Sequence, residues 1–307
     1  MCAAVQPGKV LIHLSLCDAA NPYQQLLKSE AVSAATRAGF SLETSFSHIG
    51  VVRQIQLLRS AVERPRDARP RAIIVLPVRD GTLDDVAKDA LRSDVAWVVL
   101  NRRATTLANL ISEATRSPMF AVTVDDREIG AIQARQLGVL LPGGGHVVLL
   151  RGSTTSATAV DREAGLRQNI DPARITIEVL DGGFNMDVGQ RVVENRMRDS
   201  RSVPKALVCQ NDDMALGAAR ALRSLALELG RPELSRIAVL GCDGLAAEGQ
   251  RHVEEGTFYA TVVVPSTSAA AIAELARFFN EATRPPLEIL LPAAAFPTDK
   301  VLRGRTR

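Results

Sequence analysis

Short apolar runs rich in β-branched residues alternate along the chain with longer segments in which apolar residues recur at helical spacing. This alternation is typical of an α/β protein in which helices cover both faces of a parallel sheet. Strands are expected at 9–16, 41–46, 72–76, 95–100 and 120–124, and again at 146–150, 175–180, 206–208, 237–240 and 259–264. Helices are expected at 23–37, 51–63, 83–91, 127–140, 157–169, 188–198, 214–227 and 246–254. The second half therefore repeats the first, which predicts two doubly wound parallel-sheet domains.

The last part of the chain adds a helix at 267–282 and a strand at 288–291, followed by a tail in which no helix is expected. The simplest chain path crosses between the domains near Val124, Val264 and Pro292. It predicts an N-terminal lobe of residues 1–124 plus 265–292 and a C-terminal lobe of residues 125–264 plus 293–307. Three crossings form a hinge, because a few backbone angles in parallel segments absorb opening and closing.

Length and composition fit this two-domain organisation. A chain of 307 residues corresponds to about two domains, and 46% hydrophobic residues suffice for a core in each. The charges, 37 Lys+Arg against 34 Asp+Glu, leave a net charge of +3, too balanced for a surface that binds nucleic acid or an anionic membrane. The apolar runs at 72–76 and 146–150 are far shorter than the ~20 residues of a membrane-spanning helix. Nucleic acid is therefore not an expected partner.

Sequence motifs of common enzymes and metal sites are missing. The sequence contains no GxGxxG, GxxxxGK[ST], HExxH or GxSxG, and its four histidines are not spaced as metal ligands. The glycines at 143–145 precede a predicted strand, which favours a turn over a phosphate loop. Cys2, Cys17, Cys209 and Cys242 have no CxxC spacing, and we expect free, mostly buried thiols. We expect no catalytic residues, no metal and no cofactor.

Polar residues follow the predicted strands in both halves. In open parallel sheets, ligands bind beyond the carboxyl ends of the strands. A site made of Asp, Asn and Arg suits a small polyhydroxylated molecule, because each hydroxyl both donates and accepts hydrogen bonds. An aromatic ring such as Tyr23 or Phe184 would stack on a sugar ring. The polar positions after the strands are Asn21, Tyr23, Asn101, Arg102, Arg103, Asp125, Asp126, Arg162, Asn211, Asp212, Asp213 and Asp243.

Several segments, in this order, resemble a known family. They are NPY at 21–23, LNRR at 100–103, VTVDDREIGA at 122–131, VDREAGL at 160–166, CQNDDMALGAARAL at 209–222, VLGCDGL at 239–245 and YATVVVPS at 259–266. The sequence resembles the periplasmic sugar-binding proteins of the type I fold, which include ribose-binding proteins and the effector domains of LacI-like repressors. The resemblance extends from Lys9 to about Val301, and QNDDMALGA followed by GCDG is its most specific part.

The resemblance implies which residues contact the sugar. In such proteins the Arg and Asp positions hold ring hydroxyls and the aromatic residues clamp the ring. The positions that match are Asn21, Tyr23, Asn101, Arg102, Asp126, Arg162, Phe184, Asn211 and Asp243.

Three positions depart from the family pattern. Asn101 replaces the usual Asp before the arginine, Gln24 replaces a second aromatic residue, and Val264 replaces a glutamine. Because of these departures, we expect the N-terminal lobe to bind the sugar ring less strongly than in ribose-binding proteins. They also argue against ribose as the ligand.

Each matched residue also has a structural interpretation. Asn211 and Asp243 could cap the helices that follow them, and Asp126 also suits a helix start. Arg162 could be a solvated first-turn residue, and Tyr23 could pack on its own loop.

Other residues are weaker candidates for ligand binding. Trp97 lies in the middle of a predicted strand and is expected in the core. Arg79 and Arg103 are expected at the surface, although together with Arg102 they could favour a carboxylated or phosphorylated sugar.

These features predict a non-catalytic solute-binding protein that captures a sugar or related polyol in a cleft between the lobes. The resemblance implies delivery to the membrane permease of an ABC importer. The alternatives are a ligand sensor for a signalling receptor or regulator and, less favoured, a two-lobed sugar-processing enzyme. A DNA-binding repressor is disfavoured because no helix-turn-helix fits ahead of the first strand. We expect a monomer in the periplasm, with no export signal recognised in this chain; the cytoplasm is the alternative.

Overall fold

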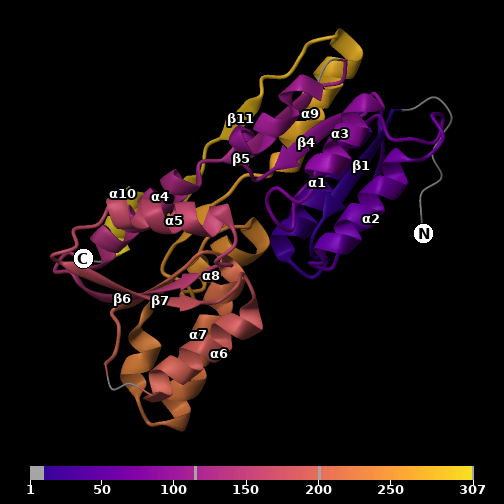
Figure 1. Cartoon of the computed structure of the whole chain (residues 1–307). Helices are drawn as coiled ribbons and strands as arrows, with labels where there is room; N and C mark the ends of the chain where they lie inside the picture. The colour runs from indigo at the N-terminus through magenta and orange to yellow at the C-terminus, as the bar shows by residue number, and fades with distance from the viewer. Residues whose placement is uncertain (1–9, 114–115, 200–201, 306–307) are drawn as a thin grey trace. The chain divides into compact units, whose positions relative to one another are not determined.

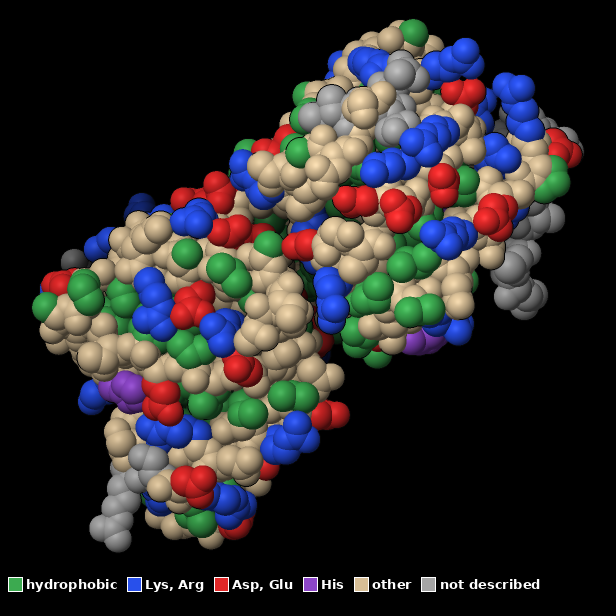
Figure 2. Space-filling model, viewed as in Figure 1, with side chains coloured by type: hydrophobic (Ala, Val, Ile, Leu, Met, Phe, Trp, Pro, Cys, Tyr) green, Lys and Arg blue, Asp and Glu red, His purple; other side chains and the backbone are tan. Residues whose placement is uncertain are grey.

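The computed structural model describes residues 10–113, 116–199 and 202–305, and the chain folds into two units. Unit 1 comprises residues 1–124 and 266–291, and unit 2 comprises residues 125–265 and 292–307. Each unit contains a parallel sheet with helices on both faces, which confirms the predicted α/β fold class. On the face shown in Figure 2, Lys and Arg alternate with Asp and Glu over both units.

Unit 1 is built on a six-stranded parallel sheet in the order β11-β5-β4-β3-β1-β2. Its inner strands β1, β3, β4 and β5 are buried along their whole length, as expected for strands covered on both faces. The strands are β1 Leu11–Leu16, β2 Ser41–Phe46, β3 Ala72–Val75, β4 Ala96–Leu100, β5 Met119–Val124 and β11 Glu288–Leu291.

Two groups of helices cover the unit 1 sheet (Figure 1). On one face, α1 (Pro22–Ala38) packs beside α9 (Thr267–Glu281). On the other, α2 (Val51–Val62), α3 (Asp84–Arg92) and the 3₁₀ segment η1 (Ala104–Glu113) enclose a core. Trp97 lies in this core with 1% of its surface exposed, which confirms its predicted role.

Unit 2 is built on a four-stranded parallel sheet in the order β7-β6-β8-β9, with a separate antiparallel pair, β10 and β12. The segment that contains β10 lies alongside β9, because isolated parallel bridges link Leu240 to Ala260 and Asp243 to Val263. The strands are β6 Gly145–Arg151, β7 Ile175–Asp181, β8 Ala206–Cys209, β9 Ala238–Leu240, β10 Thr261–Val263 and β12 Ala294–Phe296.

Pairs of closely packed helices cover the two faces of the unit 2 sheet. Helices α4 and α5 approach so closely that a Cβ atom at Gly130 would lie 2.1 Å from the Arg162 carbonyl oxygen, and one at Gly165 would lie 2.0 Å from the Arg127 carbonyl oxygen. Helices α6 and α7 pack over the other face around buried residues such as Val193. The helical segments are α4 Asp126–Leu140, α5 Ala157–Gln168, α6 Met186–Asp199, α7 Asp212–Glu228, η2 Pro232–Arg236, η3 Ala246–Gln250, α8 Arg251–Glu254 and α10 Asp299–Arg305.

Two regions differ from the sequence prediction. The tail, in which no helix was expected, forms β12 and α10, because pairing with β10 and burial of Leu302 in the unit 2 core stabilise it. Residues 104–113 form the unpredicted segment η1. Leu107 and Leu110 are 1% and 2% exposed. They are three positions apart and so lie on one side of a 3₁₀ helix, which has three residues per turn. This spacing differs from the α-helical spacing on which the prediction was based.

Membrane spans and metal sites are missing from the described part of the chain. Among those residues, no helix is long and apolar enough to span a bilayer, and no group of His, Cys, Asp and Glu is arranged as a metal site. Cys17, Cys209 and Cys242 are buried free thiols, whereas Cys2 lies outside the described residues. Burial raises the pKa of the Cys17 thiol to about 12.

Candidate functional site

Three of the candidate residues of unit 2 follow strands of its sheet at their carboxyl ends, and two lie in helices α4 and α5. The β–α connections of a parallel sheet all emerge at this edge, so residues distant in sequence lie near one another there. The residues are Asp126 at the start of α4, Arg162 in α5, Phe184 between β7 and α6, Asn211 after β8 and Asp243 after β9.

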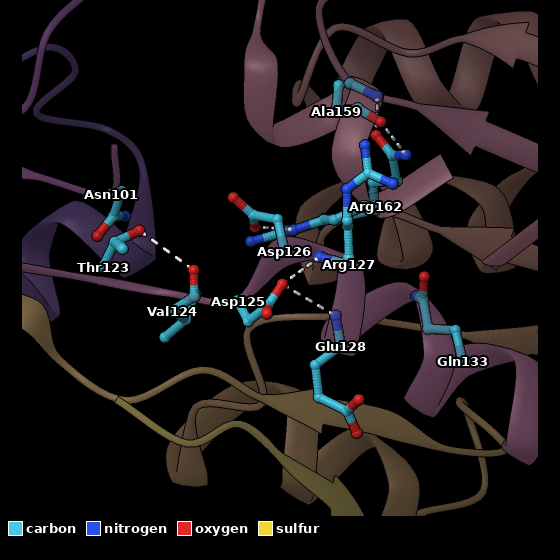
Figure 3. A network of polar contacts seen from close by, with 12 residues as sticks. Asn101, Thr123, Val124, Asp125, Asp126, Arg127, Glu128, Gln133, Ala159 and Arg162 are labelled. Carbon is cyan, nitrogen blue, oxygen red and sulfur yellow. Dashed lines mark hydrogen bonds and ion pairs between the residues drawn. The ribbon is translucent and has the colours of Figure 1, made fainter. Parts of the chain in front are cut away.

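Arg162 is the central charged residue of this group. Its side chain is 7% exposed, and its Nε donates to Asp126 Oδ1 at 2.9 Å and its Nη1 to the Gln210 carbonyl oxygen at 2.6 Å (Figure 3). Burial alone would lower the guanidinium pKa, but Cys242, Asp126 and Asp243 outweigh it and raise the pKa above its ordinary value. The interpretation of Arg162 as a solvated first-turn residue is therefore wrong.

The two adjacent acids at the start of α4 have different roles. Asp125 caps the helix, because its Oδ1 accepts from the backbone N–H groups of Arg127 at 3.0 Å and Glu128 at 3.3 Å (Figure 3). Asp126, the first helical residue, turns instead to Arg162. Since Asp125 provides the cap, Asp126 is available to neutralise the buried guanidinium.

Asn211 and Phe184 lie together at the ends of β8 and β7. Asn211 Oδ1 accepts from the Met214 N–H at 3.0 Å and caps α7, and its Nδ2 donates to the Phe184 carbonyl oxygen at 3.4 Å. Phe184 has a φ of 59°, and its ring lies over Gly152, where a Cβ atom would be 2.1 Å from the ring. The capping interpretation of Asn211 is confirmed, and contact of Asn211 and Phe184 with a ligand stays a prediction.

Gln210 was missed by the sequence analysis, although it organises this edge. It is fully buried, its Oε1 accepts from the Gly152 N–H at 2.8 Å, and its Nε2 donates to the Ala159 carbonyl oxygen at 2.9 Å. Its own carbonyl oxygen holds Arg162. A polar residue immediately after the apolar strand ALVC was the signal that could have found it.

Asp243 occupies a turn with an uncommon backbone. Its φ is 118°, a region that residues with a Cβ rarely adopt. Burial raises the pKa of its carboxyl well above the ordinary value, the nearby Asp212 raises it further, and Arg162 lowers it. The next helical segment begins at Ala246 with Leu245 as N-cap, so the interpretation of Asp243 as a helix cap is wrong.

In unit 1, Asn21 and Gln24 organise the loop after β1. Asn21 caps α1, its Oδ1 accepting from the Gln24 N–H at 3.0 Å. Gln24, which replaces the family's second aromatic residue, accepts with Oε1 from the backbone N–H groups of Cys17 at 2.8 Å and Asp18 at 2.9 Å. The glutamine thus fixes the loop that carries Asn21 and Tyr23.

Tyr23 and Asn101 are linked in a second, uncharged network. Asn101 Nδ2 donates to the Tyr23 hydroxyl at 3.3 Å, and Asn101 Oδ1 accepts from the Thr267 hydroxyl at 2.7 Å. Tyr23 is 8% exposed and Thr267 is fully buried. The amide of Asn101 therefore has one donor and one acceptor engaged within unit 1.

Arg102 is held by its own unit. Its Nε pairs with Asp80, its Nη1 donates to the Asn101 carbonyl oxygen at 2.8 Å, and its Nη2 donates to the Pro77 carbonyl oxygen at 3.2 Å. The neighbouring Arg103 pairs with Glu288 at 3.1 Å. These arginines are therefore neutralised within unit 1.

A small pocket of about 30 Å³, partly open to solvent, is lined in part by this ion pair. Its apolar floor includes Trp97 and Leu107, and its rim carries Arg79, Asp80 and Arg102. Arg79, expected at the surface, stands at this rim.

The chain matches a protein family over most of its length. The model of the periplasmic binding protein domain matches residues 12–276. The ribose import binding protein RbsB of Salmonella typhimurium is 23% identical over 257 residues, which make up 83% of this chain and 79% of that protein. The xylitol-binding protein of Mycolicibacterium smegmatis is 27% identical over 195 residues, 62% of this chain and 50% of that protein.

Solved structures show the same fold. The Caulobacter myo-inositol binding protein bound to myo-inositol matches with a TM-score of 0.78 and 21% identity over 99% of this chain and 98% of that one. A galactofuranose binding protein matches with a TM-score of 0.80 and 21% identity, over 97% and 98% of the two chains. The resemblance inferred from the sequence motifs is confirmed: the chain belongs to the periplasmic binding protein domain family.

Proposed function

We propose that this protein binds a sugar or related polyol and releases it chemically unchanged, for delivery to the membrane permease of an ABC importer. The observation that carries the proposal is the cluster of Arg162, Asp126 and Asp243 in unit 2, a buried guanidinium beside two carboxyl groups. A pair of adjacent hydroxyl groups fits such a cluster, since each hydroxyl can donate to a carboxylate and accept from an arginine.

The second set of ligand contacts comes from unit 1. In this proposal Asn21, Tyr23, Asn101 and Arg102 contact the same ligand as Asp126, Arg162, Phe184, Asn211 and Asp243. The chain passes between the units near residues 124, 265 and 291, and we assign these three passages the role of a hinge. Contacts from both units then favour the closed conformation by the difference in affinity between the two states.

The proposed ligand carries no net charge. Arg102 pairs with Asp80, Arg103 with Glu288 and Arg162 with Asp126. Because each of these guanidinium groups already has a carboxylate partner, an anionic sugar would meet no excess positive charge. This charge balance supports a neutral polyol over the carboxylated or phosphorylated sugar considered above.

The relatives of the chain suggest a first panel of compounds. They include proteins named for ribose, D-allose, D-xylose and xylitol, and structures with bound myo-inositol. Thermal-shift measurements with these compounds and with D-glucuronate and ribose 5-phosphate test the proposal. At 100 times its Kd, a ligand stabilises the native state by about 2.7 kcal/mol, a shift of several degrees.

We expect at least one neutral compound to raise the melting temperature and neither anion to do so. The bound compound, recovered after incubation and identified by NMR, should be unchanged. A panel in which no compound raises the melting temperature, or in which the compound is converted, would contradict the proposal. We further propose that the protein acts in the periplasm, as the description of its family suggests, and that it is a monomer.

A further inference from the structure

Asp212 is a buried carboxyl group that none of the contacts above explains. It is the first residue of α7, next to the capping Asn211, and is 6% exposed. A carboxyl group at the start of a helix commonly faces solvent, where it favours the helix dipole. Burial of this one is costly without partners, so its contacts indicate what it does.

The Asp212 carboxyl group holds the turn that follows β9. Oδ2 accepts from the Gly244 N–H at 2.7 Å, Oδ1 accepts from the Thr261 hydroxyl at 2.8 Å, and the backbone of Cys242 donates to the same carboxyl. At the other end of the turn, Gln133 Nε2 donates to the Gly241 carbonyl oxygen at 3.2 Å. The turn is therefore fixed at both ends by buried side chains.

Two glycines make room for this carboxyl group. A Cβ atom at Gly241 would lie 2.1 Å from Asp212 Oδ1, and one at Gly249 would lie 2.0 Å from Oδ2. Both distances are far below van der Waals contact, so any side chain at either position would displace the carboxyl group. The space around Asp212 is thus shaped from two separate segments.

The turn needs such support because its backbone is strained. Asp243 has a φ of 118° and Gly244 one of 59°. Strained conformations of this kind persist when the surrounding structure over-determines them. The Asp243 N–H donates to the Val262 carbonyl oxygen at 3.0 Å and its carbonyl oxygen accepts from the Val264 N–H at 3.0 Å. Two side chains hold Gly244: Asp212 accepts from its N–H, and Gln250 Nε2 donates to its carbonyl oxygen at 2.8 Å.

We propose that Asp212 is a positioning residue for ligand binding: its carboxyl group fixes the turn 242–244 so that the carboxyl group of Asp243 is presented beside Arg162. The effect of Asp212 on the structure of the turn can be tested without a ligand. Its effect on ligand affinity rests on the proposed function. Asp212 itself touches no ligand in this proposal.

The charges around the turn are consistent with this role. Burial raises the pKa of Asp212 to about 7, against the lowering effect of its hydrogen bonds with Thr261 and Gly244. Asp213 raises the pKa of both Asp212 and Asp243, Asp212 and Glu248 raise that of Asp243, and Arg162 lowers that of Asp243. The buried thiols of Cys209 and Cys242 also face this group of charges.

The test compares three variants of the full chain by amide hydrogen exchange across residues 241–245 and by calorimetry with the panel compounds. Asp212→Ala removes the acceptor of the Gly244 N–H and is expected to accelerate exchange in the turn and to weaken binding about tenfold or more. Asp212→Asn is expected to restore most of the protection, because an amide oxygen can accept from Gly244 while its NH₂ group donates to Thr261. Gly249→Ala should reproduce the effect of Asp212→Ala with the carboxyl group still present.

The control is Ser224→Ala, which changes an exposed residue of the same helix far from the turn and should change neither readout. Unchanged exchange at 241–245 in both Asp212→Ala and Gly249→Ala would overturn the proposal, as would equal loss in Asp212→Ala and Asp212→Asn. If Asp212→Ala fails to fold, hydrogen exchange in Gly249→Ala and Asp212→Asn tests the proposal instead: faster exchange in the first and near wild-type exchange in the second support it, and any other result overturns it. If the wild-type protein binds no panel compound, the proposed function fails while the exchange measurement still decides the role of Asp212.

Discussion

The two units place different chemistry at the carboxyl ends of similar parallel sheets. Unit 2 presents a buried guanidinium flanked by carboxyl groups, Arg162 with Asp126 and Asp243. Unit 1 presents a network of amide and hydroxyl groups, Tyr23, Asn101 and Thr267, and an arginine, Arg102, whose polar atoms are engaged by Asp80 and by backbone carbonyls. Charge-assisted hydrogen bonds are about twice as strong as neutral ones. Unit 2 should therefore provide most of the affinity, whereas unit 1 should mainly select the shape of the ligand.

The largest expected effect comes from Arg162→Ala. It removes the central charge of unit 2 and leaves Asp126 without its guanidinium partner, which should lower the free energy of unfolding by about 3 kcal/mol and weaken ligand binding by more than about tenfold. Arg167→Ala is the control on the same helix, because Arg167 is 46% exposed and pairs with Glu163 at the surface. Chemical denaturation and calorimetry measure both quantities, and similar results for the two variants would contradict the central role of Arg162.

Asp243→Ala should affect affinity without the loss of stability. Burial raises the pKa of this carboxyl and disfavours its charge in the folded state, so its removal should leave the melting temperature unchanged or higher. Binding should weaken by more than about tenfold, since a ligand hydroxyl loses its carboxyl partner. Calorimetry with the compound found in the screen measures the change. Equal affinity in variant and wild type would remove Asp243 from the site.

The pH dependence of stability should distinguish the units. Asp212 in unit 2 has its pKa raised to about 7, from near 4 in the unfolded chain, so the folded state binds more protons between these values. The free energy of unfolding contributed by this group should therefore fall as pH rises from about 4 to about 7. In unit 1, partial burial would raise the pKa of Glu43, but His13 and Arg64 outweigh it and lower the pKa. The free energy of unfolding contributed by Glu43 should therefore fall as pH decreases, opposite to the trend for Asp212.

Melting temperatures of the wild type and of Asp212→Asn between pH 4 and 8, at constant ionic strength, isolate the contribution of Asp212. The variant should lose less stability than the wild type across this range. Identical slopes would show that Asp212 does not titrate there.

Asp80→Asn should give unit 1 an unpaired positive charge, that of Arg102, whereas Arg162 in unit 2 keeps its partner Asp126. We expect binding of D-glucuronate relative to D-glucose to improve by about tenfold, roughly the worth of one newly available charged contact. Asp84→Asn serves as the control, because Asp84 accepts from Asn109 at 3.4 Å and does not pair with Arg102. Competition calorimetry gives the ratio, and an unchanged ratio in Asp80→Asn would argue against charge balance as the basis of selectivity.

The smallest expected effect is that of Thr267→Val, which keeps the shape of a fully buried residue and removes its hydrogen bond to Asn101. The free energy of unfolding should fall by about 1–2 kcal/mol, because the Asn101 carbonyl loses its donor. Thr267→Ser retains the hydroxyl and should be closer to the wild type in denaturant unfolding. The same loss in both variants would indicate a packing effect in place of the hydrogen bond.

Sequence patterns predicted the regular elements well because these depend on local periodicity. Strand 41–46 and helix 51–63, for example, appear as Ser41–Phe46 and Val51–Val62. The helix Asp299–Arg305 escaped prediction because burial of Leu302 against distant segments stabilises it. Tertiary contacts of this kind leave no periodic signal in a short segment.

The site could be predicted only in part for a similar reason. Position after a strand identified Arg162 and Asp243, but it did not identify the partner of Arg102, Asp80, which lies 22 residues away in the sequence. Nor could it distinguish Asp212 from Asp213, since both are acids in one helical turn. Burial of the first depends on the space left by Gly241 and Gly249, which the local sequence does not reveal.

The division of the chain also bears on how the protein folds during synthesis. The sheet of unit 1 acquires its edge strand β11 from residues 288–291, and unit 2 buries Leu302 near the carboxyl end. Neither unit can reach its final packing on the ribosome until residues 288–302 have been translated. Until then β5 lacks its outer partner strand and the unit 2 core lacks Leu302, so both sheets are completed by segments made after them.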